Sequence, residues 1–361
     1  MKIGVVVHGP EIVDSGYALK IINLLKNFGE VKAKLGGTMG RVAVIDNDLT
    51  DIIDISEKLL PSEALKKLAK DCDILILMNY GKSKITGHTF GKIVIERANV
   101  EKPIIQIERP GEKDGTIIIW RNSDYAEKIA KYLAEKLKLM IEKCISNGLS
   151  CWIDKGRVYR KVHGVDVGEA IMVNGIVIGK AKSRDVILVA EGGRIVDIIG
   201  GELKLEGLER LKEIDLEKAI IKTGILRRNP KKIKVKDNKI NEGYVKIINH
   251  CGEDVLKYIN NELLAIITIG DDTTTICGDI LARFGIRVIG VVDGDIDGIL
   301  KDPKFTKGSI IFYIKNVRDD IAGEIIENNL DFSKKYSWDE IIKKVKEIFE
   351  KNHIKYSIQK L

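Results

Sequence analysis

Acidic residues follow two apolar runs in the last third of the chain. The first run, Leu263–Ile269, ends at Gly-Asp-Asp, and the second, Ile286–Val292, ends at the sequence DGDIDG. Short apolar runs bounded by Gly and Asp are typical of strands that are buried on both faces of a parallel sheet. The carboxyl ends of neighbouring parallel strands meet at one sheet edge, where open α/β folds bind ligands. The spacing therefore predicts one site that contains five carboxylates, those of Asp271, Asp272, Asp293, Asp295 and Asp297.

This concentration of carboxylates predicts a bound cation. Without neutralisation, the five negative charges would repel one another at a cost of several kcal/mol if they were desolvated. Mg²⁺ prefers a few carboxylates together with water molecules and the phosphate oxygens of a ligand, so we predict Mg²⁺ as the cofactor. The alternative interpretation is that these Asp residues only cap helices and stabilise turns, which Asp-Gly at a strand end commonly does.

Three threonines follow the first acidic turn. Thr273, Thr274 and Thr275 open a helix that is predicted over Thr273–Phe284. They offer hydroxyl and backbone N–H groups to an anion. The carboxylates that precede these threonines would repel a bare phosphate. A phosphate can therefore bind beside the threonines only if a cation bridges the phosphate and the carboxylates. The predicted ligand is therefore a phosphorylated small molecule or a nucleotide. The threonines are otherwise ordinary residues of a helix N-terminus.

Two glycine-containing turns in the N-terminal part also predict ligand contacts. The first follows a strand over Lys2–Val7, and the second is the sequence GGTMGR. The glycines of the second turn permit close backbone approach and its Arg supplies charge. Neither turn is GxGxxG or a P-loop, so classical NAD binding is not expected. Asn79-Tyr80-Gly81-Lys82 ends a later strand and could join the same crevice. The predicted ligand contacts here are His8, Gly9, Gly36, Gly37, Thr38 and Arg41.

The alternation of strand-length and helix-length segments predicts an α/β protein with two Rossmann-like doubly wound domains and a small β-rich module between them. The Asn174-Gly175 pair between short strands predicts a hairpin within that module. The predicted boundaries are an N-terminal domain over 1–148, the module over 149–206, a helical connection and basic linker over 207–240, and a C-terminal domain over 241–361.

Several local predictions accompany this organisation. Apolar spacing predicts one helix over Ile12–Phe28, a long helix capped by Ser123 and reaching Ser146, and a helix over Leu216–Thr223. The basic segment Arg227–Lys236, which is broken by Pro, is predicted to be an exposed, solvated connection.

The amino-acid composition limits the classes of protein to which this chain is expected to belong. The 361 residues are 44% hydrophobic and 31% charged, as in a globular protein. The net charge of +7 is spread along the chain, so nucleic acid is not the expected partner. The five cysteines form no CxxC pair, which favours reduced thiols. No apolar run has membrane-spanning length and no signal peptide is evident, so we expect a cytoplasmic protein without a membrane partner. A homo-oligomer is left open.

Three long motifs carry a resemblance to a known family. HGPEIVDSG (8–16), GGTMGRVAVID (36–46) and GDDTTTICGDILARFGIRVIGVVDGDIDG (270–298) resemble DUF2117, an archaeal family of unknown function. The resemblance implies an archaeal cytosolic protein and supplies no catalytic residue. More locally, VVDGDIDG resembles the DxDxxG turn of Toprim domains, which holds magnesium beside a phosphodiester, with Asp293, Asp295 and Gly298 matching. The glutamate of Toprim domains is replaced here by aspartates, and the interval between the two acidic turns is shorter.

Three functions follow from these residues. The first is Mg²⁺-dependent binding or processing of a nucleotide or another phosphorylated small molecule at the acidic turns. The second is a non-catalytic ligand sensor or assembly factor, because no pair of base and nucleophile can be assigned. The third is Toprim-like nucleic-acid phosphoryl chemistry. Ligand identity separates the third function from the first two. A mononucleotide would support the first two functions, whereas a salt-sensitive complex with DNA or RNA would support the third.

Overall fold

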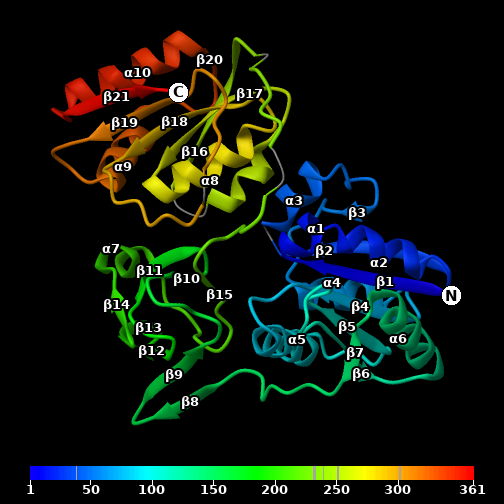
Figure 1. Cartoon of the computed structure of the whole chain (residues 1–361). Helices are drawn as coiled ribbons and strands as arrows, with labels where there is room; N and C mark the ends of the chain where they lie inside the picture. Colours follow the sequence, from blue (N-terminus) through cyan, green and yellow to red (C-terminus); the bar gives the residue numbers. More distant parts are fainter. Residues whose placement is uncertain (38, 231–232, 239, 250–251, 301) are drawn as a thin grey trace.

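The computed structural model describes residues 1–37, 39–230, 233–238, 240–249, 252–300 and 302–361. These residues form a mixed α/β structure with four sheets in three consecutive parts of the chain. Figure 1 shows the N-terminal part in blue and cyan, a β-rich part in green, and the C-terminal part in yellow to red. The mixed α/β class predicted from the sequence is therefore confirmed.

The N-terminal part is built on one seven-stranded sheet. Its strands are β1 (Lys2–His8), β2 (Glu30–Gly36), β3 (Ile53–Asp54), β4 (Ile74–Asn79), β5 (Ile104–Glu108), β6 (Thr116–Arg121) and β7 (Met140–Glu142). They pair in the order β3-β2-β1-β4-β5-β6-β7, and every adjacent pair is parallel except β5 with β6. The apolar runs of β1 and β4 are buried, as a parallel sheet covered on both faces requires.

Helices cover both faces of this sheet. They are α1 (Glu11–Asp14), α2 (Tyr17–Leu25), α3 (Gly40–Asp46), α4 (Pro61–Ala69), α5 (Lys84–Ala98) and α6 (Asp124–Leu137). Side chains of α1, α2, α3 and α6 pack in one core, whereas those of α4 and α5 pack in a second core. The connection that follows β1 therefore crosses one face of the sheet, whereas the connection that leads into β4 crosses the opposite face. Strand order reverses at this point, and the carboxyl ends of β1 and β4 flank a crevice.

The β-rich part consists of two four-stranded sheets and a short helix. Its elements are β8 (Cys151–Asp154), β9 (Arg157–Val162), β10 (Ala170–Val173), β11 (Ile176–Ala181), β12 (Val186–Glu191), β13 (Arg194–Ile199), β14 (Gly201–Leu203), α7 (Leu205–Arg210) and β15 (Ile221–Thr223). The sheets are β14-β11-β10-β15 and β13-β12-β9-β8, with antiparallel neighbours. Asn174 and Gly175 have φ angles of 50° and 87° between β10 and β11. Positive φ at both residues is the conformation of a two-residue hairpin turn, so the hairpin predicted at this pair is confirmed.

The C-terminal part is built on a second sheet that contains parallel strands. Its elements are β16 (Glu242–Asn249), the 3₁₀ helix η1 (Gly252–Tyr258), β17 (Leu263–Ile269), α8 (Asp271–Leu281), β18 (Arg287–Val292), β19 (Ile310–Ile314), α9 (Asp319–Asn329), β20 (Lys335–Ser337), α10 (Trp338–Lys351) and β21 (Tyr356–Lys360). The strand order is β20-β16-β17-β18-β19-β21, and the four central strands are parallel. The predicted strand–helix–strand unit around α8 is confirmed.

Three predicted helices differ from the structure. The segment Ile12–Phe28 contains two helices, because Gly16 adopts a φ of 79° between α1 and α2, a conformation that glycine reaches without strain. The helix predicted to reach Ser146 ends at Leu137, because Lys138 takes the left-handed conformation and the following residues form β7 beside β6. The last residues of the helix predicted over Leu216–Thr223 form β15 instead, because they pair with β10.

A buried network of ion pairs joins the N-terminal and C-terminal parts. Arg227 donates to Asp14 and to Asp46, each at 2.6 Å. The other oxygen of Asp46 accepts from Arg283 at 2.7 Å, and Arg283 also pairs with Asp279. The side chains of Arg227, Asp14, Asp46 and Arg283 are at most 4% exposed. Asp14 and Asp46 come from α1 and α3, whereas Asp279 lies on α8 and Arg283 follows that helix, so the network connects helices that cover two separate sheets.

This network corrects the prediction for the basic segment. Arg227 was predicted to be solvated, but it is 3% exposed, because two carboxylates from the N-terminal part neutralise its charge. Lys234 and Lys236 are exposed, as predicted, while residues 231–232 lie outside the described part of the chain.

Candidate functional site

Four carboxylates converge at the carboxyl edge of the C-terminal sheet. One oxygen each from Asp271, Asp293, Asp295 and Asp319 lies within 4.8 Å of the others, and this group is called the acidic cluster below. Asp271 follows β17, Asp293 and Asp295 follow β18, and Asp319 follows β19, so the ends of three adjacent strands position the four carboxylates. Such a set of hard oxygens matches the ligand preference of Mg²⁺ or Ca²⁺.

Backbone geometry positions Asp271 in the cluster. Gly270, which precedes α8, has a φ of 102°, a conformation that glycine adopts without strain. Asp271 Oδ2 accepts hydrogen bonds from the backbone N–H groups of Asp293 at 3.2 Å and Gly294 at 2.9 Å. These bonds hold the two acidic turns together. Burial raises the pKa of Asp271, although the backbone hydrogen bonds oppose that shift.

Asp319 is the member of the cluster that sequence analysis missed. It is 1% exposed, its Oδ1 accepts from Arg210 at 3.2 Å, and its Oδ2 is buried without a hydrogen-bond partner in the described part of the chain. A Cβ built on Gly270 would lie 3.9 Å from that Oδ2, which places the oxygen at the start of α8. Burial, contact with Asp320 and the charge of Asp293 raise the pKa of Asp319 to about 8. An unpartnered buried carboxylate oxygen is costly unless a cation or proton meets it.

Asp272 and Asp297 were predicted as metal ligands but lie outside the group of four. Asp297, with a side chain that is 5% exposed, pairs with Lys204 at 2.7 Å and Lys180 at 3.4 Å. Asp272 Oδ2 accepts from the backbone N–H of Asp297 at 3.3 Å, and its Oδ1 is buried without a partner among the described residues. Burial and the Asp297 charge raise the pKa of Asp272 to about 7. Lys204 also pairs with Asp295 at 2.8 Å.

The predicted threonines lie in the first turns of α8, next to the cluster. Thr274 Oγ1 is 2.8 Å from Thr268 Oγ1 within the sheet, and Thr275 Oγ1 donates to the carbonyl of Asp271. Both hydroxyls are therefore used internally. Thr273 lies beside Gly270 at the helix start and is 7% exposed.

The predicted ligand residues of the N-terminal part lie at a different place. A cavity of about 720 Å³ opens at the carboxyl ends of β1 and β4, and His8, Gly9 and Gly37 line it. Gly36 packs against Pro61 instead, and Arg41 is not among the described lining residues. Thr38 lies outside the described residues. The described lining contains none of the cluster's four aspartates, so the structure separates the two predicted sets of ligand residues.

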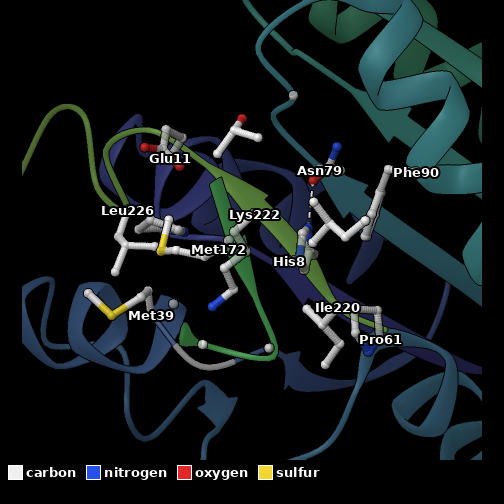
Figure 2. Close-up of a pocket in the computed structure, with 18 of the residues that line it drawn as sticks. His8, Glu11, Met39, Pro61, Asn79, Phe90, Met172, Ile220, Lys222 and Leu226 are labelled. Carbon is white, nitrogen blue, oxygen red and sulfur yellow. Dashed lines mark hydrogen bonds between the residues drawn. The ribbon is translucent and has the colours of Figure 1, made fainter. Parts of the chain in front are cut away.

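His8 occupies a defined orientation in this cavity (Figure 2). Its Nδ1 lies 2.7 Å from Asn79 Oδ1, and its ring stacks on Phe90 with centroids 4.1 Å apart. Asn79 Nδ2 donates to Glu108 at 2.8 Å, and Glu108 also accepts from the backbone N–H of Gly81 at 2.7 Å. Because the amide nitrogen of Asn79 faces Glu108, its oxygen faces His8, so Nδ1 of His8 is the donor and Nε2 carries the lone pair.

The pKa of His8 provides a test of this arrangement. Burial lowers this pKa from 6.5 to about 4, the charge of Lys222 acts in the same direction, and the Asn79 hydrogen bond opposes them. As the pH falls, His8 of the unfolded chain is protonated near pH 6.5, whereas His8 of the folded chain is protonated only near pH 4. The neutral, buried imidazole therefore contributes its full stability above pH 6.5, and this stability is lost as the pH falls from 6.5 to about 4. We expect the His8 Cε1–H resonance, assigned by its loss in His8→Gln, to titrate near pH 4. A midpoint close to the ordinary value of 6.5 would refute the buried, neutral imidazole.

The fold and the cluster define a mixed α/β protein with an acidic centre suited to a metal ion. Residues 5–334 match the family described as an uncharacterized protein conserved in archaea (DUF2117), and the chain belongs to that family, as its motifs predicted. It is 70% identical over 359 residues to the uncharacterized protein MJ0065 of Methanocaldococcus jannaschii, a match that covers 99% of each chain. No solved structure matches the chain. No helix in the described ranges has the length and apolarity needed to cross a bilayer.

Proposed function

We propose that this protein binds Mg²⁺ at the acidic cluster and uses the ion to bind a phosphorylated small molecule or nucleotide. The observation that carries the proposal is the convergence of four carboxylate oxygens within 4.8 Å, one of them from a residue that is 1% exposed. Bringing these charges together without a cation is unfavourable, and Mg²⁺ would remove that repulsion. Neither Asp271 nor Asp293 forms an ion pair within the described residues, so both charges are available to a metal.

The surroundings of the cluster support an anionic ligand on the metal. Lys204 lies 2.8 Å from Asp295, and Arg210 lies 3.2 Å from Asp319; both cations belong to the β-rich part. A phosphate that completes the coordination of Mg²⁺ would present its other oxygens to these side chains. The helices α8 and α9 also begin at the cluster, where backbone N–H groups favour negative charge. The cluster lies at the carboxyl edge of the parallel strands β17, β18 and β19, and this is the edge at which open α/β sheets bind ligands.

The first experiment measures metal binding in the absence of any other ligand. We expect wild-type protein to bind one Mn²⁺ per chain by electron paramagnetic resonance, with Mg²⁺ competing. Asp293→Asn should weaken this binding at least about tenfold, because it removes an exposed ligand without disturbing the core. Asp339→Asn, an exposed aspartate at the start of α10, should leave it unchanged. Equal affinities in Asp293→Asn and Asp339→Asn would refute the metal centre.

The ligand is then sought by thermal unfolding with nucleotides and phosphorylated metabolites, with and without Mg²⁺. Binding at about 100-fold over the dissociation constant stabilises a protein by about 2.7 kcal/mol, a shift that is readily measured. A Mg²⁺-dependent shift with a mononucleotide that is lost in Asp293→Asn would support the proposal. Binding that is restricted to DNA or RNA and abolished by salt would favour the Toprim-like alternative.

A further inference from the structure

The cavity at the carboxyl ends of β1 and β4 has the size and the position of a small-molecule site. Its volume is about 720 Å³, and small-molecule sites commonly enclose about 300–1,000 Å³. It opens where strand order reverses in the N-terminal sheet, which is the position at which open α/β sheets bind ligands. All three parts of the chain contribute to the cavity, through residues such as Pro61, Met172 and Ile276.

The walls of the cavity are mostly apolar. Figure 2 shows Met39, Met172 and Leu226 on one side, with Ile220 and Pro61 on the other. A ligand with an apolar body would bury its surface against these side chains and release water from both surfaces. Two of the side chains are thioethers, which make favourable contacts with aromatic rings. The walls therefore favour an aromatic body.

The charged groups of the wall are already paired within the chain. The ion pairs are Lys58 with Asp254, Lys82 with Glu169 at 2.7 Å, and Arg228 with Glu11 at 3.4 Å, and Lys222 also interacts within the chain. An ionised ligand group would lose its hydration here without gaining a counter-charge, unless it broke one of these pairs. The cavity therefore favours an uncharged ligand.

Glycines leave one polar edge of the cavity uncovered. Gly9 and Gly37 both line the cavity, and their φ angles are 82° and 113°, which glycine adopts without strain. A Cβ on Gly37 would lie 3.4 Å from Cδ2 and 3.7 Å from Nε2 of His8, and the nearest atom to a Cβ on Gly9 is a carboxylate oxygen of Glu11 at 4.0 Å. A larger residue at position 37 would therefore cover the edge of the imidazole that carries Nε2.

His8 offers one hydrogen-bond acceptor at this edge. The Glu108–Asn79–His8 series fixes the Nδ1–H tautomer, so Nε2 carries the lone pair. Stacking on Phe90, with ring centroids 4.1 Å apart, holds the orientation of the ring. A ligand with an O–H or N–H group would satisfy Nε2, whereas an ether or a hydrocarbon would not.

We propose that this cavity binds an uncharged organic molecule with an aromatic body and an O–H or N–H donor, the body lying against Met172 and Ile220 and the donor bonded to Nε2 of His8. This site is separate from the acidic cluster and requires no metal. A ligand here would contact the N-terminal, β-rich and C-terminal parts at once, and would therefore stabilise their association.

The test compares three naphthalene derivatives that differ in one group. 2-Naphthol is uncharged at neutral pH and carries an O–H donor, 2-methoxynaphthalene has no donor, and naphthalene-2-sulfonate carries a negative charge. By calorimetry, we expect 2-naphthol to saturate one site per chain, with the same affinity in the presence of EDTA. The methyl ether should bind about fivefold more weakly, because one hydrogen bond is lost. The sulfonate should bind at least about tenfold more weakly than 2-naphthol, because the cations of the wall are already paired.

Two substitutions in the cavity test its two contributions separately. Ile220→Trp places a larger side chain in the cavity and should weaken the binding of 2-naphthol at least about tenfold. His8→Phe keeps an aromatic ring beside Phe90 but removes the acceptor, so it should bind 2-naphthol and its methyl ether with equal affinity. Ile153→Trp changes an exposed side chain of β8 and is the matched control for Ile220→Trp, with the affinity of wild type expected. Circular dichroism and thermal unfolding establish that each variant is folded.

Four results would overturn the proposal. They are a failure of 2-naphthol to saturate at one site, a sulfonate that binds as tightly as 2-naphthol, an Ile220→Trp protein with the same affinity as Ile153→Trp, and a His8→Phe protein that still prefers 2-naphthol over its methyl ether. Because Asp293→Asn should bind 2-naphthol normally, failure of the metal centre would leave this result unaffected.

Discussion

Asp46→Asn should lower the free energy of unfolding by about 3–5 kcal/mol, the usual cost of breaking a buried ion pair from one side. The carboxylate of Asp46 accepts from Arg227 at 2.6 Å and from Arg283 at 2.7 Å, and all three side chains are at most 4% exposed. The neutral amide would leave two buried guanidinium groups with less compensation, even though Asp14 and Asp279 remain near them. Urea unfolding with linear extrapolation measures the change.

Asp48→Asn provides a matched control a short distance further along the chain. Asp48 is 83% exposed and lies 3.7 Å from Lys234, which is also exposed. The same substitution there should cost less than about 0.5 kcal/mol, because an exposed ion pair contributes little to stability. The left-handed conformation of Asp48 also suits Asn. Equal losses in the two variants would show that the buried network contributes no more than a surface pair.

Gly87→Ala should destabilise the N-terminal part by about 2–5 kcal/mol. A Cβ at Gly87 would lie 2.0 Å from Cδ of Glu108, which is fully buried between α5 and the sheet. Either the helix or the carboxylate must move, and a displaced carboxylate would leave the donors of Asn79 and Gly81 unpaired. These losses exceed the gain of about 1 kcal/mol that Ala brings over Gly within a helix.

The control for this change is Ile85→Ala on the exposed side of the same helix, where the side chain is 45% exposed. We expect that variant to stay within about 0.5 kcal/mol of wild type. A second measurement is the His8 titration, because Gly87→Ala disturbs Glu108 and through it Asn79. A Gly87→Ala protein with wild-type stability and an unchanged His8 midpoint would contradict the close helix–sheet contact.

The parts of the site that were predictable from the sequence are those carried by local patterns. Leu263–Ile269 and Ile286–Val292 are mainly apolar runs that are followed by Asp residues, so both strands and the proximity of Asp271 to Asp293 could be predicted from the pattern alone. Asp319 was missed because it follows β19 after an interval and stands at a helix start, where acids are common for dipole reasons. No local sequence pattern distinguishes Asp319 from the acidic residues that commonly occupy the first turn of a helix.

The errors in the fold arose where pairing with distant residues decided the conformation. Apolar residues continue past Leu137 at helical spacing, yet Met140–Glu142 pairs with β6. Ile221–Thr223 likewise pairs with β10, a strand far earlier in the chain, and such pairing overrides local preference. Arg227 was misjudged for the same reason, because its partners Asp14 and Asp46 are 213 and 181 residues away.

That separation has a consequence for how the chain acquires its structure. Asp14 and Asp46 are synthesised early, whereas Arg227 and Arg283 follow 181 or more residues later. The N-terminal sheet has mainly local strand–helix–strand contacts and can form while the rest of the chain is still being made. Its two acids then stay hydrated until the arginines arrive. We therefore expect docking of the C-terminal sheet to be the last and slowest folding step, because it closes the longest segments of chain and desolvates four charges together.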